Sequence, residues 1–182
     1  MSVENEFPTH PFWDYSLLIY STPGVADACL ALQDDFGLDV NMVLFCVWCG
    51  VEGPGRLDSE QINACLSRTT DWQKQVIEPL RAVRRTCKIQ SGAETDSFSQ
   101  ILRRRVQAVE LDAEHVEQLV LAGIVENSPV IDDAEHEPAD DAIHNIFAYL
   151  EALEVAADDQ ILECLDDIVS AVFPGANLSR PS

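Results

Sequence analysis

The chain has 182 residues, with 11 Lys and Arg against 32 Asp and Glu and a formal net charge of −21. Its apolar content of 47% is enough to bury a core, which excludes a disordered acidic tail. The negative charge disfavours nucleic acid and anionic membrane surfaces as partners. The N-terminus carries no basic, apolar leader, and no segment approaches the roughly 20 apolar residues of a membrane span. We therefore expect a cytoplasmic protein that contacts no membrane.

The charge is unevenly distributed along the chain. Residues 1–55 contain eight acids and no Lys or Arg, whereas residues 56–105 contain ten basic residues and six acids. Residues 106–182 contain eighteen acids and a single basic residue. Such asymmetry is typical of an interaction face, or of a contact between oppositely charged segments of one chain.

Helical periodicity along almost the whole chain predicts an all-α protein. An aromatic-rich helix is expected over Pro11–Tyr20. The next is expected to start at Thr22-Pro23, where Thr suits the N-cap and Pro the first helical position, and to run to Phe36. A third helix should begin near Asp39. Because it is apolar on nearly all sides, we expect it at the centre of the core.

The middle of the chain predicts an amphipathic helix with a basic outer face. Asp58 is a candidate N-cap, and the spacing of Thr70 and Gln73 is that of a capping box that would start a fresh helix. Pro79, inside the same pattern, either kinks the helix or starts its second half. Five basic residues fall within about 100° on the face opposite the apolar stripe: Lys74, Arg81, Arg84, Arg85 and Lys88.

One long helix is expected from about Asp96 to Glu126, with Arg103, Arg104 and Arg105 spread around its first turns. Its apolar residues follow four- and three-residue steps and form a seam that either packs within the domain or presents a coiled-coil-like arm. The seam comprises Phe98, Leu102, Val106, Val109, Ala113, Val116, Val120 and Ile124.

These elements predict a multi-helix, orthogonal or bundle-like core with one long helix at residues 7–126. An acidic linker loop is expected at 127–139, followed by an acidic helical hairpin at 140–175. The basic face is then either solvated, docked on that hairpin, or free to bind a partner.

No complete catalytic or cofactor motif is present: the chain has no Gly-rich phosphate loop, nucleophile elbow or Ser/His/Asp order. Cys46 and Cys49 form a C-x-x-C inside an apolar helix, which predicts buried, protonated thiols. Three Asp-x-x-His spacings keep a metal site open as an alternative. They are Asp112/His115, Asp133/His136 and Asp141/His144. We predict no catalytic residue, cofactor or metal ligand.

The basic residues are the candidate partner-binding residues: Lys74, Arg81, Arg84, Arg85, Lys88, Arg103, Arg104 and Arg105. With the acidic hairpin they predict a non-enzymatic adaptor or regulatory protein that binds another protein, and the mixed charges also allow a homodimer. A metal-binding or enzymatic helical bundle is the alternative. RNA binding through the basic helix is a third interpretation, weakened by the lack of stacking aromatic residues.

Several segments in order carry a resemblance to a known family: FWDYSLLIY at 12–20, Pro23-Gly24-Val25, CLALQD at 29–34, Asp39-Val40-Asn41, and Trp72 with Pro79-Leu80-Arg81 and Arg84-Arg85. Together they resemble an uncharacterised family of small proteobacterial proteins, a domain of unknown function of the DUF2390 type, over roughly residues 7–125. The resemblance implies a helical cytoplasmic bacterial protein and supplies no activity or catalytic residue. It also implies that the C-terminal part varies among members of the family. The resemblance further implies that other members have apolar residues at the positions of Cys46 and Cys49, which counts against a redox role for these cysteines.

Overall fold

The computed structural model describes residues 7–89, 96–126, 137–176 and 178. Within these ranges no strand is present, and the predicted all-α fold is confirmed. The helices are α1 (Pro11–Tyr20), α2 (Val25–Asp34), α3 (Val40–Val51), α4 (Ser59–Trp72), the π-helical turn η1 (Gln73–Ile77), α5 (Glu78–Ile89), α6 (Asp96–Glu126), α7 (Pro138–Ala152) and α8 (Asp159–Val172). None of these described helices is long and apolar enough to cross a membrane.

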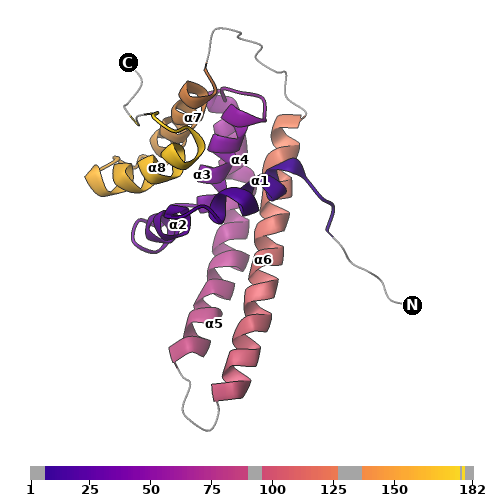
Figure 1. The fold of residues 1–182 in the computed structure, drawn as a ribbon. Coiled ribbons are helices and arrows are strands. Elements are labelled where there is room, and N and C mark those ends of the chain that lie inside the picture. The colour runs from indigo at the N-terminus through magenta and orange to yellow at the C-terminus, as the bar shows by residue number, and fades with distance from the viewer. Residues whose placement is uncertain (1–6, 90–95, 127–136, 177, 179–182) are drawn as a thin grey trace.

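Helix α3 lies in the middle of the fold, in contact with α1, α2, α6 and α7 (Figure 1). Every residue from Val40 to Gly50 is buried. Asp39 is the N-cap, and its Oδ1 accepts a hydrogen bond from the backbone N–H of Asn41 at 2.9 Å. The predicted start and central position of this helix are therefore confirmed.

Helix α2 is shorter than predicted. It begins at Val25 rather than at Pro23, because Gly24 before it has a φ of 89°. This left-handed conformation suits glycine and interrupts a right-handed helix. The helix ends at Asp34, two residues before the predicted end at Phe36.

The two C-terminal helices pack on different parts of the fold. Helix α7 packs against α3, whereas α8 packs mainly against α2. Ile146 and Tyr149 of α7 belong to the same buried cluster as α3, and Tyr149 Oη accepts a hydrogen bond from the backbone N–H of Asp39 at 3.0 Å. The predicted boundaries 7–126, 127–139 and 140–175 stay predictions, and residues 127–136 lie outside the described ranges. The structure does show that α7 shares its core with the N-terminal helices.

Gly50 and Asn145 fix how α3 and α7 meet. A Cβ on Gly50 would lie 2.6 Å from the carbonyl oxygen of Pro138, so only glycine permits this approach. The buried Asn145 holds the loop after α3: its Oδ1 accepts from the N–H of Leu57 at 2.7 Å, and its Nδ2 donates to the carbonyl of Gly55 at 3.0 Å. The loop backbone therefore keeps hydrogen-bond partners inside the protein.

The start of α4 was predicted correctly, but a fresh helix at Thr70 was not found. Asp58 caps α4 in a capping box with Gln61. Thr70 lies inside α4, where its Oγ1 donates to the carbonyl of Leu66 at 2.6 Å. The predicted capping box of Thr70 and Gln73 is therefore wrong, because the hydroxyl bonds to the preceding turn of the same helix.

Helices α4, η1 and α5 form one continuous helical segment from Ser59 to Ile89. Pro79 lacks an N–H, and its ring opposes the carbonyl four residues earlier. The turn before it is π-helical, with the N–H of Glu78 bonded to the carbonyl of Gln73. This wider turn accommodates the proline in the first turn of α5, and it leaves Gln73 buried.

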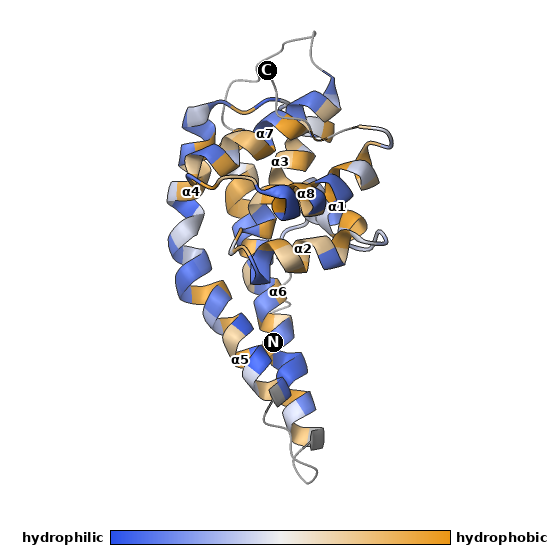
Figure 2. Ribbon diagram, turned by 90° about the vertical axis from the view of Figure 1, so that its left-hand side faces the viewer, coloured by the Kyte–Doolittle hydropathy of each residue, from blue (hydrophilic) through white to orange (hydrophobic). Residues whose placement is uncertain are grey.

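Helix α5 and the N-terminal half of α6 form a hairpin that projects from the rest of the fold (Figures 1 and 2). We call residues 79–89 and 96–109 the arm, and the other described residues the body. The predicted seam of α6 faces solvent on the arm: Phe98, Leu102 and Val109 are 73%, 52% and 52% exposed. The sequence left two interpretations of the seam, packing within the domain or presentation on an arm. In this half of α6 the seam lies on an arm.

Candidate functional site

Ion pairs between α5 and α6 join the arm to the body. Arg84 binds Glu110 through two hydrogen bonds, from Nε to Oε2 at 2.6 Å and from Nη2 to Oε1 at 3.0 Å. Arg81 Nη2 donates to Glu114 Oε1 at 2.7 Å, and its Nε lies 3.7 Å from Glu110 Oε1. The bonds to Glu110 raise the pKa of Arg84, and burial raises the pKa of Glu114 against the opposing effect of Arg81. These largely buried pairs fix the register of α5 on α6.

The basic face is only in part the outer face that the sequence predicted, because Lys74, Arg85 and Lys88 are exposed but Arg81 and Arg84 are not. Arg81 and Arg84 point toward α6, and Arg81 is only 5% exposed. Arg85 Nη1 binds Asp34 Oδ1 of α2 at 3.0 Å. Among the described residues, the acids that pair with this face come from α6 and α2, not from the C-terminal helices. For Arg81 and Arg84 the prediction was wrong because their partners, Glu114 and Glu110, lie 33 and 26 residues away in the sequence.

The remaining predicted basic residues lie in two places. Lys74 is exposed on η1 and, with Arg85, lines a hollow of about 530 Å³ that Asp39 and Tyr149 also border. The other four lie on the arm: Lys88, Arg103, Arg104 and Arg105. The structure thus brings Arg81 and Arg84 together at the root of the arm, places Lys74 and Arg85 beside the hollow, and leaves the other four on the arm. A role of these residues in partner binding stays a prediction.

One face of α6 on the arm is apolar, exposed and interrupted by a single arginine. At 100° per residue its members fall within about 60° of one another. They are Phe98, Leu102, Arg105 and Val109, which we call the arm stripe. Arg105 forms no ion pair with any residue that the structure describes. Figure 2 shows hydrophobic and hydrophilic residues interspersed along this projecting part of the fold.

A buried polar cluster lies where α6 enters the body. Glu117 Oε2 accepts hydrogen bonds from Asn41 Nδ2 at 2.6 Å and from Gln73 Nε2 at 2.9 Å, while Gln118 Nε2 donates to Asn41 Oδ1 at 2.9 Å. Burial, together with the charge of Asp39, raises the pKa of Glu117 to about 9. Burial also raises the pKa of Asp39 to about 6. Burial therefore favours the neutral form of Glu117 within this network of amides.

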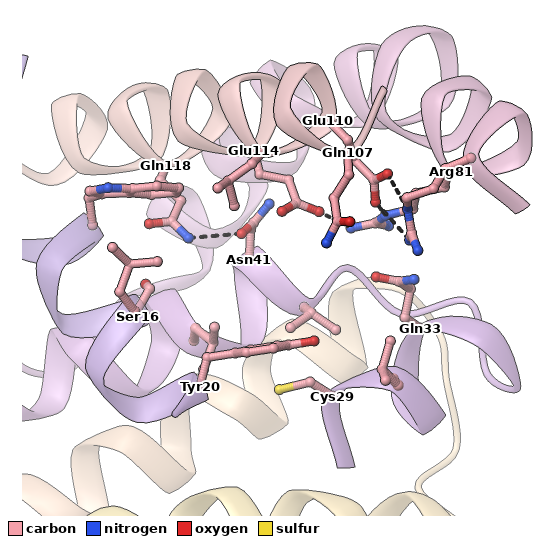
Figure 3. A pocket seen from close by; sticks show the side chains of 17 residues that line it. Ser16, Tyr20, Cys29, Gln33, Asn41, Arg81, Gln107, Glu110, Glu114 and Gln118 are labelled. Atoms are coloured by element: carbon pink, nitrogen blue, oxygen red, sulfur yellow. Dashed lines mark hydrogen bonds and ion pairs between the residues drawn. The ribbon is translucent and has the colours of Figure 1, made fainter. Parts of the chain in front are cut away.

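A groove of about 360 Å³ opens beside this cluster and the ion pairs (Figure 3). We call it the α1–α6 groove. Its polar wall comes from α3, α5 and α6 and contains Asn41, Arg81, Arg84, Glu110, Glu114 and Gln118. Its apolar rim is formed by Leu17, Tyr20, Leu30 and Leu111, which are all exposed. Although part of the Tyr20 side chain is exposed, the burial of the rest raises its pKa above the usual value. Its hydroxyl therefore keeps its proton and can donate a hydrogen bond.

The cysteines of the C-x-x-C are buried in the core, as predicted. Cys46 and Cys49 are both fully buried in α3, and burial raises the pKa of each thiol well above its usual value. Thiols in this state are poor nucleophiles and poor metal ligands. The arrangement therefore gives these two residues the role of small apolar side chains in the core.

The Asp-x-x-His spacings lie in unrelated surroundings. Asp112 is exposed, whereas His115 is buried and stacks on Trp13 with ring centroids 4.1 Å apart. Burial lowers the pKa of His115. Asp141 binds Arg56 at 3.3 Å, and Asp133/His136 lies outside the described ranges. No group of three or more His, Cys, Asp or Glu that could hold a metal ion occurs among the described residues.

Sequence reasoning missed the acidic and amide residues of the site. A usable signal was present, because Glu110, Glu114 and Glu117 recur at i, i+4 and i+7 and share one helical face. An acidic face on the long helix and a basic face on the preceding helix predict a hairpin with facing charges. Asn41 and Gln73 carried no comparable signal, since each is one polar residue in a helical pattern.

A family model, described as a protein of unknown function (DUF2390), matches residues 11–121. The match includes α1 to α5 and most of α6, so it contains the arm stripe, the ion pairs at its root and the α1–α6 groove. No curated protein and no solved structure matches the chain. Because the matched segment covers more than half of the chain, the protein belongs to this family of unknown function, DUF2390.

Proposed function

We propose that the protein is a non-enzymatic cytoplasmic adaptor or regulatory protein that binds an acidic amphipathic helix of a partner protein on the arm stripe. The observation that carries the proposal is the exposure of Phe98, Leu102 and Val109 along one face of a projecting helix. Apolar side chains aligned over successive turns cost free energy in water and are typical of a protein interaction surface. Inside the body, the same helix buries Ala113, Leu121, Ala122 and Val125.

Charge complementarity gives the partner its acidic character. Residues 79–109, which contain the arm, hold seven basic and two acidic residues, whereas the rest of the chain holds four basic and thirty acidic residues. A long polyanion such as RNA would meet the acidic body as well as the arm. A short helix with acidic residues beside its apolar face would contact the arm alone, and Arg105 offers it a guanidinium that forms no ion pair with the described residues.

The geometry of the arm stripe favours a helix as the bound element. From Phe98 to Val109 the stripe spans three turns of α6, or roughly 17 Å at 1.5 Å per residue. A partner helix of three to four turns could place apolar residues at i, i+3, i+4 and i+7 against this length. Its acidic flanks would then lie beside Arg105.

Site-specific photocrosslinking tests the proposal. A photoreactive amino acid at position 98 of the full chain, expressed in its native host, should crosslink to a defined peptide that is acidic and amphipathic. That peptide, synthesised and labelled, should bind the purified protein with an affinity that falls as salt is raised. A crosslinked peptide without excess acidic residues, or a peptide that does not bind the purified protein, would contradict the proposal.

Two neighbouring arginines provide a matched pair of variants. Arg105→Glu changes the arm stripe, whereas Arg104→Glu makes the same charge change about 100° away on the helix. We expect Arg105→Glu to weaken peptide binding about tenfold or more and Arg104→Glu to weaken it much less. Equal losses would show that only net charge matters. A protein that is dimeric in sedimentation experiments and becomes monomeric in Leu102→Glu would instead show that a second copy occupies the stripe.

A further inference from the structure

The α1–α6 groove contains buried polar atoms without partners. Among the described residues, Oε1 of Gln118, which is 4% exposed, has no hydrogen-bond partner. The Nε of Arg81, which is 5% exposed, lies 3.7 Å from Glu110 Oε1 and has no hydrogen bond to any described residue. Both residues line the groove (Figure 3). Buried acceptors and donors are rarely left unsatisfied, so their presence at the wall of an open groove points to a ligand that completes them.

We propose that the α1–α6 groove binds an extended, uncharged peptide segment with apolar side chains. This second site goes beyond the binding of an acidic helix by the arm stripe and does not depend on it. With a volume of about 360 Å³, the groove lies within the size range of sites that hold a small molecule or a few residues of a peptide.

The charges of the groove wall exclude a strongly ionic ligand. Arg81 and Arg84 face Glu110 and Glu114, so two guanidinium groups are already neutralised by two carboxylates. An anionic ligand would compete with these carboxylates for buried arginines, and a cationic ligand would compete with the arginines. Breaking a buried pair leaves an uncompensated charge, which is strongly unfavourable. A neutral ligand leaves the pairs intact.

The unpartnered atoms match the peptide group. Gln118 Oε1 requires a donor and Arg81 Nε requires an acceptor, and each peptide unit offers one N–H and one carbonyl. Gln33 and Gln107 add further amide groups to the lining. A bound helix would have already used its backbone groups internally, whereas an extended segment keeps them free.

The rim supplies contacts for apolar side chains. Leu17, Tyr20, Leu30 and Leu111 are 48%, 41%, 42% and 46% exposed. They come from α1, α2 and α6 and surround the groove without closing it. A peptide side chain seated among them would remove apolar surface on both molecules from water. This is the contact that would give an uncharged peptide its affinity.

The groove and the arm stripe can be occupied together. On α6 the groove is lined by Gln107, Leu111 and Gln118, whereas the stripe contains Leu102 and Val109. At 100° per residue these two sets lie on roughly opposite faces of the helix. An adaptor built in this way could hold two different partner segments at the same time.

The test uses ¹⁵N-labelled full-length protein and four capped tetrapeptides, acetyl-Ala-Xaa-Ala-Ala-amide with Leu, Met, Phe or Tyr as Xaa. At millimolar concentration at least one peptide should shift the side-chain amide signals of Gln118 and Asn41. The same peptide with Glu in place of its third residue should bind at least about fivefold more weakly, because Arg81 and Arg84 in the wall are already paired with Glu110 and Glu114. No shift with any of the four, or equal binding of the acidic peptide, would overturn the proposal.

Two adjacent leucines of α1 provide the matched control. Leu17 lines the groove, whereas Leu18, which is 65% exposed, does not. Leu17→Ser should weaken binding about tenfold and Leu18→Ser by less than twofold, because only the first removes an apolar contact with the peptide. If N-methylacetamide alone produces the same shifts as the peptides, with no effect of Leu17→Ser, the groove binds small amides only and the peptide proposal is wrong. Both variants change exposed positions, so loss of the fold does not obscure the comparison.

Discussion

The two halves of α6 have similar apolar content but different surroundings. On the arm, Phe98 and Leu102 are largely exposed, and α6 runs alongside α5 (Figure 1). In the body, the same helix contacts α1, α3 and α4, and Leu121 and Val125 are buried. A periodic apolar pattern therefore predicts a helix equally well in both halves, but burial depends on helices from elsewhere in the chain.

The polar residues of α6 show the opposite trend. Glu117 and Gln118 are buried in the body, whereas Arg104 and Arg105 are exposed on the arm. The body half thus buries polar groups in a hydrogen-bonded network, and the arm half exposes apolar groups to water. Within that network Gln118 Oε1 still lacks a partner among the described residues, and a buried polar atom in this state is unfavourable, as is an exposed row of apolar side chains. Each of these two features therefore points to a binding surface rather than to the stability of the fold.

The largest expected effect separates the two halves directly. Leu121→Ala removes a fully buried side chain and should lower the free energy of unfolding by about 3–4 kcal/mol through lost transfer energy and a residual cavity. Leu102→Ala, in the same helix but 52% exposed, should change it by less than about 0.5 kcal/mol. Urea unfolding of both variants measures the difference. Similar losses would mean that the arm stripe is covered, for instance by a second copy.

A second pair of substitutions tests how tightly the body is packed. Gly50→Ala would place a Cβ 2.6 Å from the carbonyl oxygen of Pro138 and 2.7 Å from the backbone nitrogen of Ala142. Because both are backbone atoms, α3 and α7 must separate, and we expect a loss of about 2 kcal/mol after the better helix propensity of Ala is counted.

Gly123→Ala in α6 is the control for this change. A Cβ there meets nothing within 4 Å, so Ala should stabilise the protein by about 0.5–1 kcal/mol through its helix propensity. Thermal unfolding of both variants gives the comparison. A neutral Gly50→Ala would show that α7 is not packed on α3 in solution.

Local signals in the sequence predicted local structure well. The bounds of α1 and the caps Asp39 and Asp58 were correct, because a cap depends on a side chain and the next few backbone N–H groups. The same reasoning failed at Thr70, whose hydroxyl bonds backward within an uninterrupted helix. There α4 continues without a break into a π-helical turn, so the local capping pattern does not start a new helix.

The candidate site was predictable only in part. The basic face of α5 was found, but not that Arg84 binds Glu110, because this pairing depends on which helices the hairpin brings together. Asn41 was not found, since a single polar residue in an apolar helix gives no indication of its partner. Its partner Glu117 lies 76 residues away in the sequence.

The last expected effect is a dependence of stability on pH, and it concerns the buried acid of the body half. The pKa of Glu117 is raised from 4.5 to about 9, so the folded state keeps a proton that the unfolded chain releases above pH 4.5. The stabilising contribution of this proton is complete below pH 4.5 and is lost as the pH rises toward 9. Between these limits it lowers the free energy of unfolding by up to about 1.4 kcal/mol per pH unit.

Glu117→Gln removes this titration and keeps an acceptor for Asn41 and Gln73. The variant should therefore show a shallower decline in stability between pH 6.5 and 8.5, a range above the raised pKa of Asp39, which is about 6. Exposed Glu60→Gln makes the same side-chain change outside the buried network and should retain the wild-type slope. The midpoints of urea unfolding at four pH values, measured for the wild type and both variants, give the three slopes. Parallel slopes for all three proteins would show that Glu117 is ionised in the folded state, and that the neutral network beside the groove does not form.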